Sequence, residues 1–410
     1  MSEGLNLKSM VAGHIANIPR SGIRDFFELV QGREGVISLG VGEPDFCTPW
    51  HIREAAIYSL EKGQTSYTSN LGAPRLRSAI SDYVEDFFGV RYNDADEILV
   101  TVGVSEAIDL ALRALINPGE EVIYHEPCYV SYSPSIAMAL GKAVPVKTYV
   151  EDGFSLRAEE IEKVITPQSK VLMLNFPTNP TGATLDPVEM EKIAELSIKH
   201  NLIVITDEIY SELRYTEEKH QSIVALPGMR ERTILLHGFS KAFAMTGFRL
   251  GYACGPAVLI DAMMKIHQYG ALCAPITSQA AAVEALENGA PAVEEMRRSY
   301  DQRRQFMVRK LNELGLPTCD PGGGFYVFPD IRGTGMTSSE FAKGLLEAEN
   351  VAAVPGDAFG EAGAGFLRCC YATSFDELRE AMTRMGRFLK SIGVEPVAAP
   401  CADEVAATES

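Results

Sequence analysis

One lysine of the sequence stands where its amine could act as a nucleophile. Lys241 lies between the apolar run TILLHGF and the apolar segment AFAM, and Arg249 follows eight residues later. An ammonium group withdrawn from water has a lowered pKa, which makes a neutral, nucleophilic amine available. A lysine in such surroundings can instead lay its alkyl chain along apolar surface and keep its charge in water. This segment alone leaves both interpretations open.

A carboxylate and an amide follow two other apolar runs. Asp207 ends the run LIVIT and precedes Glu208, with Tyr210 three residues beyond it, and Asn179 lies in the turn NFPTNPTG after the run VLML. Open α/β sheets bind ligands at the carboxyl ends of their strands, where a carboxylate in a low-dielectric setting needs a cationic or N–H partner. The structural alternatives are a helix N-cap for Asp207 and an ordinary Asn-Pro turn for Asn179.

The tripeptide Gly103-Val104-Ser105 connects an apolar run to the helical pattern EAIDLALRALI. A glycine turn from strand to helix directs free backbone N–H groups and the helix dipole at one point, which suits a phosphate. Ser105 can also serve only as the helix N-cap. Gly40-Val41-Gly42 lacks the third glycine of a dinucleotide fingerprint, and the sequence contains no P-loop, H-E-x-x-H or G-x-S-x-G motif. We expect no metal site.

The segments around these residues predict an α/β fold. Between Glu97 and Val204, short β-rich runs alternate with helical stretches, which is typical of parallel βαβ units. Several runs lack polar alternation, as strands covered by helices on both faces do. Strands are predicted over residues 98–102, 121–125, 143–147, 170–175, 202–206, 233–237 and 250–254. Helices are predicted over residues 106–116, 129–140, 156–164, 187–200, 257–269 and 275–288.

A long charged helical run after Gly289, PAVEEMRRSYDQRRQFMVRKLNELG, predicts the bridge to a smaller α+β domain. In that domain we expect a strand over 325–328, a helix from Ser338, strands near 351–354 and 366–371, and a final helix over 375–391. The predicted organisation is an N-terminal arm (1–45) that belongs with the small domain, a large domain (46–288), a small domain (289–395) and a flexible tail (396–410).

Charge and composition limit the partners. The 410 residues include 37 Lys and Arg against 55 Asp and Glu, a net charge of −18 that repels phosphate backbones and anionic lipids. We therefore expect no nucleic acid and no membrane as partner, since no apolar run approaches the roughly 20 residues of a spanning helix. The N-terminal segment lacks a signal-peptide pattern, and the eight cysteines form no C-x-x-C pair, so we expect reduced thiols and a cytoplasmic protein.

In their order along the chain, these motifs closely resemble the fold-type I pyridoxal-phosphate enzymes. The resemblance rests on Gly103-Val104-Ser105, Asn179-Pro180-Thr181-Gly182, Asp207-Glu208-Ile209-Tyr210, Ser240-Lys241 and Gly247-Phe248-Arg249. More narrowly, the chain from about Ser21 to Gly386 is similar to class I aminotransferases of the aspartate and aromatic amino acid branch. This implies a large domain with a mostly parallel seven-stranded sheet, a smaller α+β domain, and pyridoxal 5′-phosphate as cofactor. It also implies amino transfer from an α-amino acid to 2-oxoglutarate by a homodimer.

The resemblance gives each cofactor residue a role. Lys241 would form the Schiff base with the cofactor aldehyde and then move the proton, and Asp207 would pair with the pyridine nitrogen. Asn179 and Tyr210 would hydrogen-bond the phenolic oxygen, while Tyr129 would stack on the ring. The phosphate would be held by the following residues: Gly103, Val104, Ser105, Ser240 and Arg249. Many relatives carry a serine three residues before the lysine, where this chain has Gly238.

Other family positions concern the substrate and the second subunit. Arg368 matches the arginine that binds the α-carboxylate, and Gly40 matches a backbone contact to the same group. Tyr67 matches a tyrosine that reaches the neighbouring subunit's phosphate, so two chains would build each site.

The resemblance leaves the preferred substrate open. Ser105 stands where some aspartate-specialised relatives carry a lysine, so strict aspartate specificity is not implied, and an aromatic or broad range of donors is favoured. By family layout, Arg20 or Arg24 is the hypothetical partner of a distal carboxylate. The alternatives are an aspartate or other aminotransferase of this branch, a lyase of the same fold, and a non-enzymatic regulator. A regulator would need a DNA-binding module before Ser21.

Overall fold

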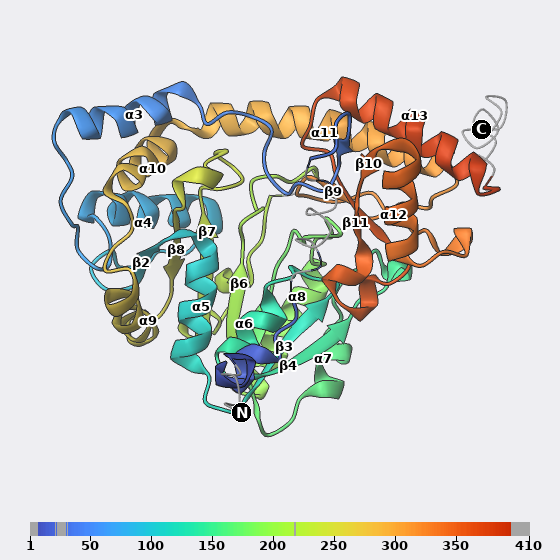
Figure 1. Cartoon of the computed structure of the whole chain (residues 1–410). Coiled ribbons are helices and arrows are strands. Elements are labelled where there is room, and N and C mark those ends of the chain that lie inside the picture. Colours follow the sequence, from blue (N-terminus) through green and yellow to red (C-terminus); the bar gives the residue numbers. More distant parts are fainter. Residues whose placement is uncertain (1–6, 21, 23–29, 31, 217–218, 395–410) are drawn as a thin grey trace, which may run out of the picture.

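The computed structural model describes residues 7–20, 22, 30, 32–216 and 219–394 (Figure 1). Its largest element is a seven-stranded sheet with the strand order β2-β8-β7-β6-β5-β3-β4. The strands are β2 (Ile98–Thr101), β3 (Glu121–Glu126), β4 (Lys142–Lys147), β5 (Ser169–Leu174), β6 (Ile203–Asp207), β7 (Thr233–Gly238) and β8 (Gly251–Cys254). All seven lie within two residues of the segments predicted from the sequence, and the predicted α/β fold is confirmed.

One strand of this sheet runs against the others. The five strands β3, β4, β5, β6 and β7 are parallel to one another, whereas β8 is antiparallel to both of its neighbours, β7 and β2. β8 follows β7 through a connection that contains only the short 3-10 helix η5 (Thr246–Phe248), so no helical crossover brings the chain back to the same edge. Lys241 and Arg249 both lie on this connection, at the edge where β6 and β7 end.

Helices cover the sheet on both faces, which explains why its strands read as continuous apolar runs. On one face, apolar side chains of α5 (Gly103–Leu115), α6 (Tyr132–Met138) and α9 (Ala257–Gly270) form one buried cluster with the strands. The opposite face packs against α4 (Pro74–Phe88), α10 (Ile276–Asn288), α7 (Ala158–Val164) and α8 (Pro187–Lys199). The sequence analysis did not predict α4 or the preceding helix α3 (Trp50–Glu61).

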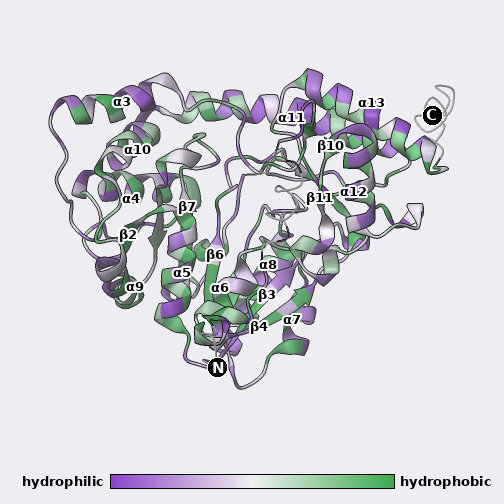
Figure 2. Cartoon of the chain, in the orientation of Figure 1, coloured by the Kyte–Doolittle hydropathy of each residue, from purple (hydrophilic) through white to green (hydrophobic). Residues whose placement is uncertain are grey.

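The carboxyl-terminal part is built around the long helix α11 (Ala290–Glu313). Its antiparallel sheet has the order β11-β12-β9, formed by Val354–Pro355, Leu367–Cys370 and Tyr326–Val327, and α12 (Ser338–Glu349) and α13 (Phe375–Ser391) pack beside it. In Figure 2, α13 alternates between hydrophilic and hydrophobic residues, as an amphipathic helix does. The strand predicted over 351–354 is interrupted at Ala353.

The N-terminal arm contacts this part through β1 (Ile37–Ser38), which pairs in parallel with β10 (Val351–Ala352). Further upstream lie the short helices η1 (Leu7–Met10) and α1 (Gly13–Ala16). The remaining 3-10 helices are η2 (Val150–Asp152), η3 (Ile223–Ala225), η4 (Arg230–Arg232), η6 (Arg332–Thr334), η7 (Gly356–Phe359) and η8 (Glu361–Gly363). No helix of the described residues is long and apolar enough to cross a membrane. The boundaries between arm, large domain, small domain and tail stay a prediction.

Candidate active site

A cavity of about 740 Å³ lies where the parallel strands end and the carboxyl-terminal sheet approaches them. Its walls contain most of the residues singled out in the sequence: Gly40, Val104, Ser105, Tyr129, Asn179, Asp207, Tyr210, Ser240, Lys241, Arg249 and Arg368. Gly103 is not a wall residue but lies close to the side chain of Arg249. Tyr67 lies outside the cavity with 82% of its surface exposed. The fold thus gathers residues that are up to about 330 positions apart in the chain.

Lys241 is half-buried, and its Nζ donates a hydrogen bond to the carbonyl oxygen of Gly42 at 2.6 Å. The Nζ atom lies 5.7 Å from the ring centroid of Phe325. Burial lowers the pKa of this amine to about 8, and the cations Arg368 and Arg249 act in the same direction. A neutral, nucleophilic amine is therefore accessible near neutral pH.

Asp207 is the last residue of β6 and is 4% exposed. Tyr132 donates its hydroxyl proton to Oδ2 at 2.8 Å, and the backbone N–H of Ile209 reaches Oδ1 at 3.3 Å. Burial raises the pKa of this carboxyl to about 6 despite both hydrogen bonds. No helix begins here, so the helix-cap alternative is wrong. This buried carboxylate forms no ion pair with a described residue, since the nearby His237 pairs with Glu212, and it therefore suits a protonated ring nitrogen.

Arg368 is a buried cation with an open donor. Its Nη2 donates to the carbonyl oxygen of Gly40 at 2.6 Å and its Nη1 donates to Oδ1 of Asn179 at 3.0 Å. Its Nε has no hydrogen-bond partner, and no described carboxylate forms an ion pair with it. The guanidinium lies 4.6 Å from the ring centroid of Tyr326. Such an uncompensated, desolvated guanidinium suits a carboxylate ligand.

Arg249 and the first turn of α5 form another part of the cavity wall. Gly103 has φ +75°, and a Cβ atom there would lie 2.8 Å from Nη2 of Arg249. The glycine thus lets the guanidinium approach the helix start, where backbone N–H groups are open. The N-cap position is Val102, and Ser105 is the third helical residue, so the N-cap alternative for Ser105 is wrong. A cation beside a helix N-terminus suits a phosphate group.

Three residues of this site were missed in the sequence. Tyr132 binds Asp207, Tyr326 lies between Tyr210 and Arg368, and the side-chain amide of Asn175 donates to the backbone carbonyl of Asp207 at 2.8 Å. Each acts through another site residue. The second tyrosine of the segment YVSY and the turn GGGFY carried no motif by which they could be recognised.

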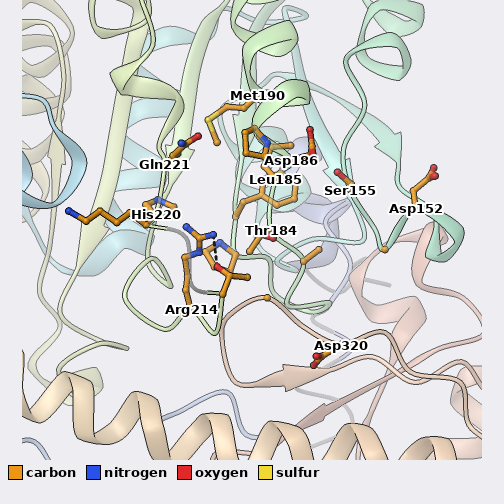
Figure 3. Close-up of a pocket in the computed structure, with 18 residues that line it drawn as sticks. Asp152, Ser155, Thr184, Leu185, Asp186, Met190, Arg214, His220, Gln221 and Asp320 are labelled. Carbon is orange, nitrogen blue, oxygen red and sulfur yellow. Dashed lines mark hydrogen bonds between the residues drawn. The ribbon is translucent and has the colours of Figure 1, made fainter. Parts of the chain in front are cut away.

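A second cavity, of about 410 Å³, contains none of the predicted residues (Figure 3). Its acidic side chains already have partners. Oδ1 of Asp186 accepts from the first backbone N–H groups of α8, Asp152 pairs with Arg157, and Asp320 pairs with Arg304. Nη2 of Arg214 donates to Oγ1 of Thr216 at 2.9 Å. The larger cavity is therefore the candidate active site.

Residues 34–385 match the family described as aminotransferase class I and II. The chain belongs to this family. It is 46% identical to an aspartate aminotransferase of Pyrococcus abyssi (strain GE5 / Orsay) and 45% identical to aromatic-amino-acid aminotransferase 2 of Thermococcus litoralis (strain ATCC 51850 / DSM 5473 / JCM 8560 / NS-C). Both matches cover 90% of this chain and 96% of the relative. The solved structure of an aromatic aminotransferase from Pyrococcus horikoshii OT3 superposes with a TM-score of 0.87 at 46% identity, covering 91% of this chain and all of that one.

These matches confirm the predicted resemblance, and the protein is an aminotransferase that uses pyridoxal 5′-phosphate. The cavity fits this cofactor on three independent points. Lys241 offers an amine, Asp207 offers a buried carboxylate, and the glycine cradle at Gly103 leaves room for a phosphate beside Arg249. Arg20 is exposed and Arg24 lies outside the described residues.

Proposed function

We propose that this aminotransferase transfers the amino group of an aromatic or other apolar α-amino acid to 2-oxoglutarate. The observation that carries the proposal is the set of cations in the cavity: Lys241, Arg249 and Arg368 are the described Lys and Arg residues in its walls. Each would already bind another group: Lys241 the cofactor aldehyde, Arg249 the cofactor phosphate and Arg368 the α-carboxylate of the substrate. At Ser105 the wall carries a neutral hydroxyl. A distal carboxylate therefore finds no further cation among these wall residues, whereas an aromatic ring finds apolar surface. The distal carboxylate of 2-oxoglutarate would need a cation from the N-terminal arm, where Arg20 and Arg24 are the candidates.

Bound pyridoxal 5′-phosphate supplies an electron-withdrawing ring that stabilises negative charge at the substrate's Cα. The chain's own residues do the rest. Lys241 Nζ would take the proton from Cα and deliver it to the C4′ carbon of the cofactor, and it would move a proton in the reverse direction when the oxo acid reacts. A pKa of about 8 allows both transfers near neutral pH. Asp207 would keep the ring nitrogen protonated, and Asn179 and Tyr210 would donate to the phenolic oxygen. Tyr129, half-buried at the wall, would stack on the ring.

The phosphate and substrate ends would be held by separate groups. Arg249, Ser240, Ser105 and the Gly103-Val104 turn would bind the phosphate. Arg368, whose Nη2 donates to the carbonyl of Gly40, would orient the α-carboxylate. Arg249 lies on the connection between β7 and β8 and Arg368 lies on β12, so two different elements would hold the phosphate and the α-carboxylate.

We further propose a homodimer in the cytoplasm. Large aromatic side chains are exposed on α3, on the segment after it and at the end of α9: Trp50 (58%), Tyr58 (55%), Tyr67 (82%) and Tyr269 (88%). Exposed aromatic groups of this kind favour a protein interface. A second copy of the chain would cover them and bring Tyr67 to the other subunit's phosphate. Sedimentation of the holoenzyme at micromolar concentration should give the mass of a dimer.

A panel of amino donors assayed with 2-oxoglutarate tests the substrate assignment. We expect kcat/KM for tyrosine and phenylalanine to exceed that for aspartate, and no stoichiometric ammonia release, which a lyase would give. The variant Ser105→Lys adds a cation to the wall, so it should raise kcat/KM for aspartate relative to phenylalanine by about tenfold. A wild-type preference for aspartate would overturn the assignment.

A further inference from the structure

We infer that Tyr326 is a positioning residue that couples the substrate-binding arginine to the tyrosine facing the cofactor. Its hydroxyl aligns the hydroxyl of Tyr210, and its ring supports the guanidinium of Arg368. This inference rests on the proposed roles of Tyr210 and Arg368. It adds a residue whose hydroxyl and ring make two separable contributions.

The position of Tyr326 follows from the small sheet. It lies on β9 and pairs with Cys370 on the antiparallel strand β12, which also carries Arg368. Tyr326 is 1% exposed, and its hydroxyl oxygen lies 3.0 Å from that of Tyr210. The two rings meet edge to face, with centroids 5.9 Å apart and an interplanar angle of 78°. Tyr326 therefore joins the carboxyl-terminal sheet to the large domain's cofactor wall.

The backbone opposite Tyr326 makes room for its hydroxyl. A Cβ atom at Gly42 would lie 2.6 Å from Oη of Tyr326, so only glycine leaves the hydroxyl where it is. The carbonyl of the same Gly42 accepts the hydrogen bond from Lys241. The hydroxyl is thus enclosed between the nucleophile's anchor and Tyr210.

The direction of the hydrogen bond between the two tyrosine hydroxyls determines how strongly Tyr210 can donate to the cofactor. In the protein without cofactor, either tyrosine can donate. When Tyr210 gives its own proton to the phenolic oxygen, its oxygen can only accept from Tyr326. Hydrogen bonds in such a chain polarise one another, so Tyr326 makes Tyr210 a stronger donor. A stronger donor stabilises negative charge on the phenolic oxygen and lowers the pH at which the bound cofactor loses its proton.

The ring of Tyr326 contributes separately. The Arg368 guanidinium lies 4.6 Å from its centroid and 4.9 Å from that of Phe359 on η7. Two aromatic faces thus hold a guanidinium whose buried Nε has no hydrogen-bond partner. Tyr326→Phe removes only the hydroxyl, whereas Tyr326→Leu removes the ring as well.

The test uses the holoenzyme and its absorbance. We expect Tyr326→Phe to raise the pH midpoint of the cofactor's spectral titration by about 0.3–1 unit, the size of one lost hydrogen bond. The dissociation constant of 3-phenylpropionate, a monocarboxylate without an amino group, should stay within about twofold. In Tyr326→Leu that constant should rise about three- to tenfold. Tyr300→Phe is the matched control, because Tyr300 is fully buried and its hydroxyl has no partner among the described residues.

A double variant separates this inference from the proposed function. Tyr210→Phe should raise the midpoint by more than Tyr326→Phe, and adding Tyr326→Phe to it should cause no further shift. If Tyr210→Phe shifts the midpoint but Tyr326→Phe does not, only the present inference is overturned. Equal shifts in both backgrounds would also overturn it. If Tyr210→Phe itself has no effect, the assignment of Tyr210 is wrong and the inference falls with it.

Discussion

The two cavities of this protein differ in how their charges are compensated. In the second cavity, the carboxylates of Asp152 and Asp320 form ion pairs with Arg157 and Arg304. In the active-site cavity, Lys241, Asp207 and Arg368 form no ion pair with any described residue. A desolvated charge without a partner costs free energy, and a ligand of opposite charge recovers it. Charge without an ion-pair partner, more than polarity or volume, therefore distinguishes the candidate active site from the second cavity.

The largest expected effect is that of Lys241→Ala. The loss of the amine removes the proton-transfer group, so we expect turnover to fall at least 10²–10⁴-fold while the other contacts still bind cofactor and substrate. Steady-state kinetics and cofactor titration measure both. Lys219→Ala, which removes an exposed cation of the second cavity, should leave turnover unchanged. Near-normal turnover of Lys241→Ala would refute the assignment.

Borohydride offers a direct check on the same residue, because it reduces the imine between a lysine and the cofactor aldehyde. Peptide mapping of the treated holoenzyme should find the phosphopyridoxyl group on Lys241. A label on another lysine would end the assignment.

Asp207→Asn should weaken cofactor binding and lower turnover by about 10- to 100-fold, since an amide cannot compensate a protonated ring nitrogen. The same substitution should increase the free energy of unfolding of the cofactor-free protein near neutral pH. The folded-state pKa of about 6 lies above the ordinary 3.8, so folding favours the protonated carboxyl, and the cofactor-free protein loses stability as pH rises from about 4 through 6.

The cofactor-free Asn variant should therefore be more stable than wild type at pH 7.5, by about 1–3 kcal/mol, with the difference shrinking as pH falls toward 4. Urea denaturation at several pH values measures this. A variant less stable than wild type at pH 7.5 would show that Asp207 carries no burial penalty in the folded protein.

Arg368 and Arg304 are both buried, but only Arg304 forms ion pairs with described residues, so their substitutions test the role of uncompensated charge. Arg368→Lys keeps the charge but loses the planar donor pair, so KM for the amino donor should rise about 10- to 30-fold. Arg304, whose Nε donates to Asp301 at 2.8 Å, is compensated inside the protein. Arg304→Lys should lower the melting temperature and leave KM unchanged. A similar rise of KM in both variants would show that Arg368 acts only through packing.

Most of the large sheet could be predicted because its strands are separated by turns and helices with clear apolar patterns. The helices α3 and α4 were missed: α4 begins at Pro74 without a capping side chain, and α3 exposes much of its apolar surface. The antiparallel direction of β8 depends on the connection after Lys241 and has no local signal.

The site divides in a similar way. Residues that contact the cofactor in the family lie in short motifs, so Lys241 and Asp207 could be found by sequence alone. Tyr132 and Tyr326 act through side-chain contacts with residues 75 and 116 positions away. Such contacts exist only once the sheet and the carboxyl-terminal strands are assembled, so no spacing rule reveals them.

The smallest expected effect concerns the N-terminal arm. If the cavity wall offers no fourth cation, the distal carboxylate of 2-oxoglutarate needs one from elsewhere, and the hypothesis assigns Arg20 or Arg24. Arg20 is exposed and forms no ion pair with a described residue, so a carboxylate ligand would meet an uncommitted guanidinium. Because the contact forms near water, its loss should raise KM for 2-oxoglutarate only about two- to fivefold.

The hypothesis about the arm predicts different effects on the two substrates. Arg20→Ala or Arg24→Ala should raise KM for 2-oxoglutarate and leave KM for phenylalanine unchanged, since an aromatic donor has no distal charge. Arg33→Ala, which removes an exposed arginine farther along the arm, serves as the matched control. Equal changes for both substrates would indicate a dimer or folding contact, and no change would place the recognition of the distal carboxylate elsewhere. In either case the uncompensated charges of the cavity would account for the α-carboxylate and the cofactor alone.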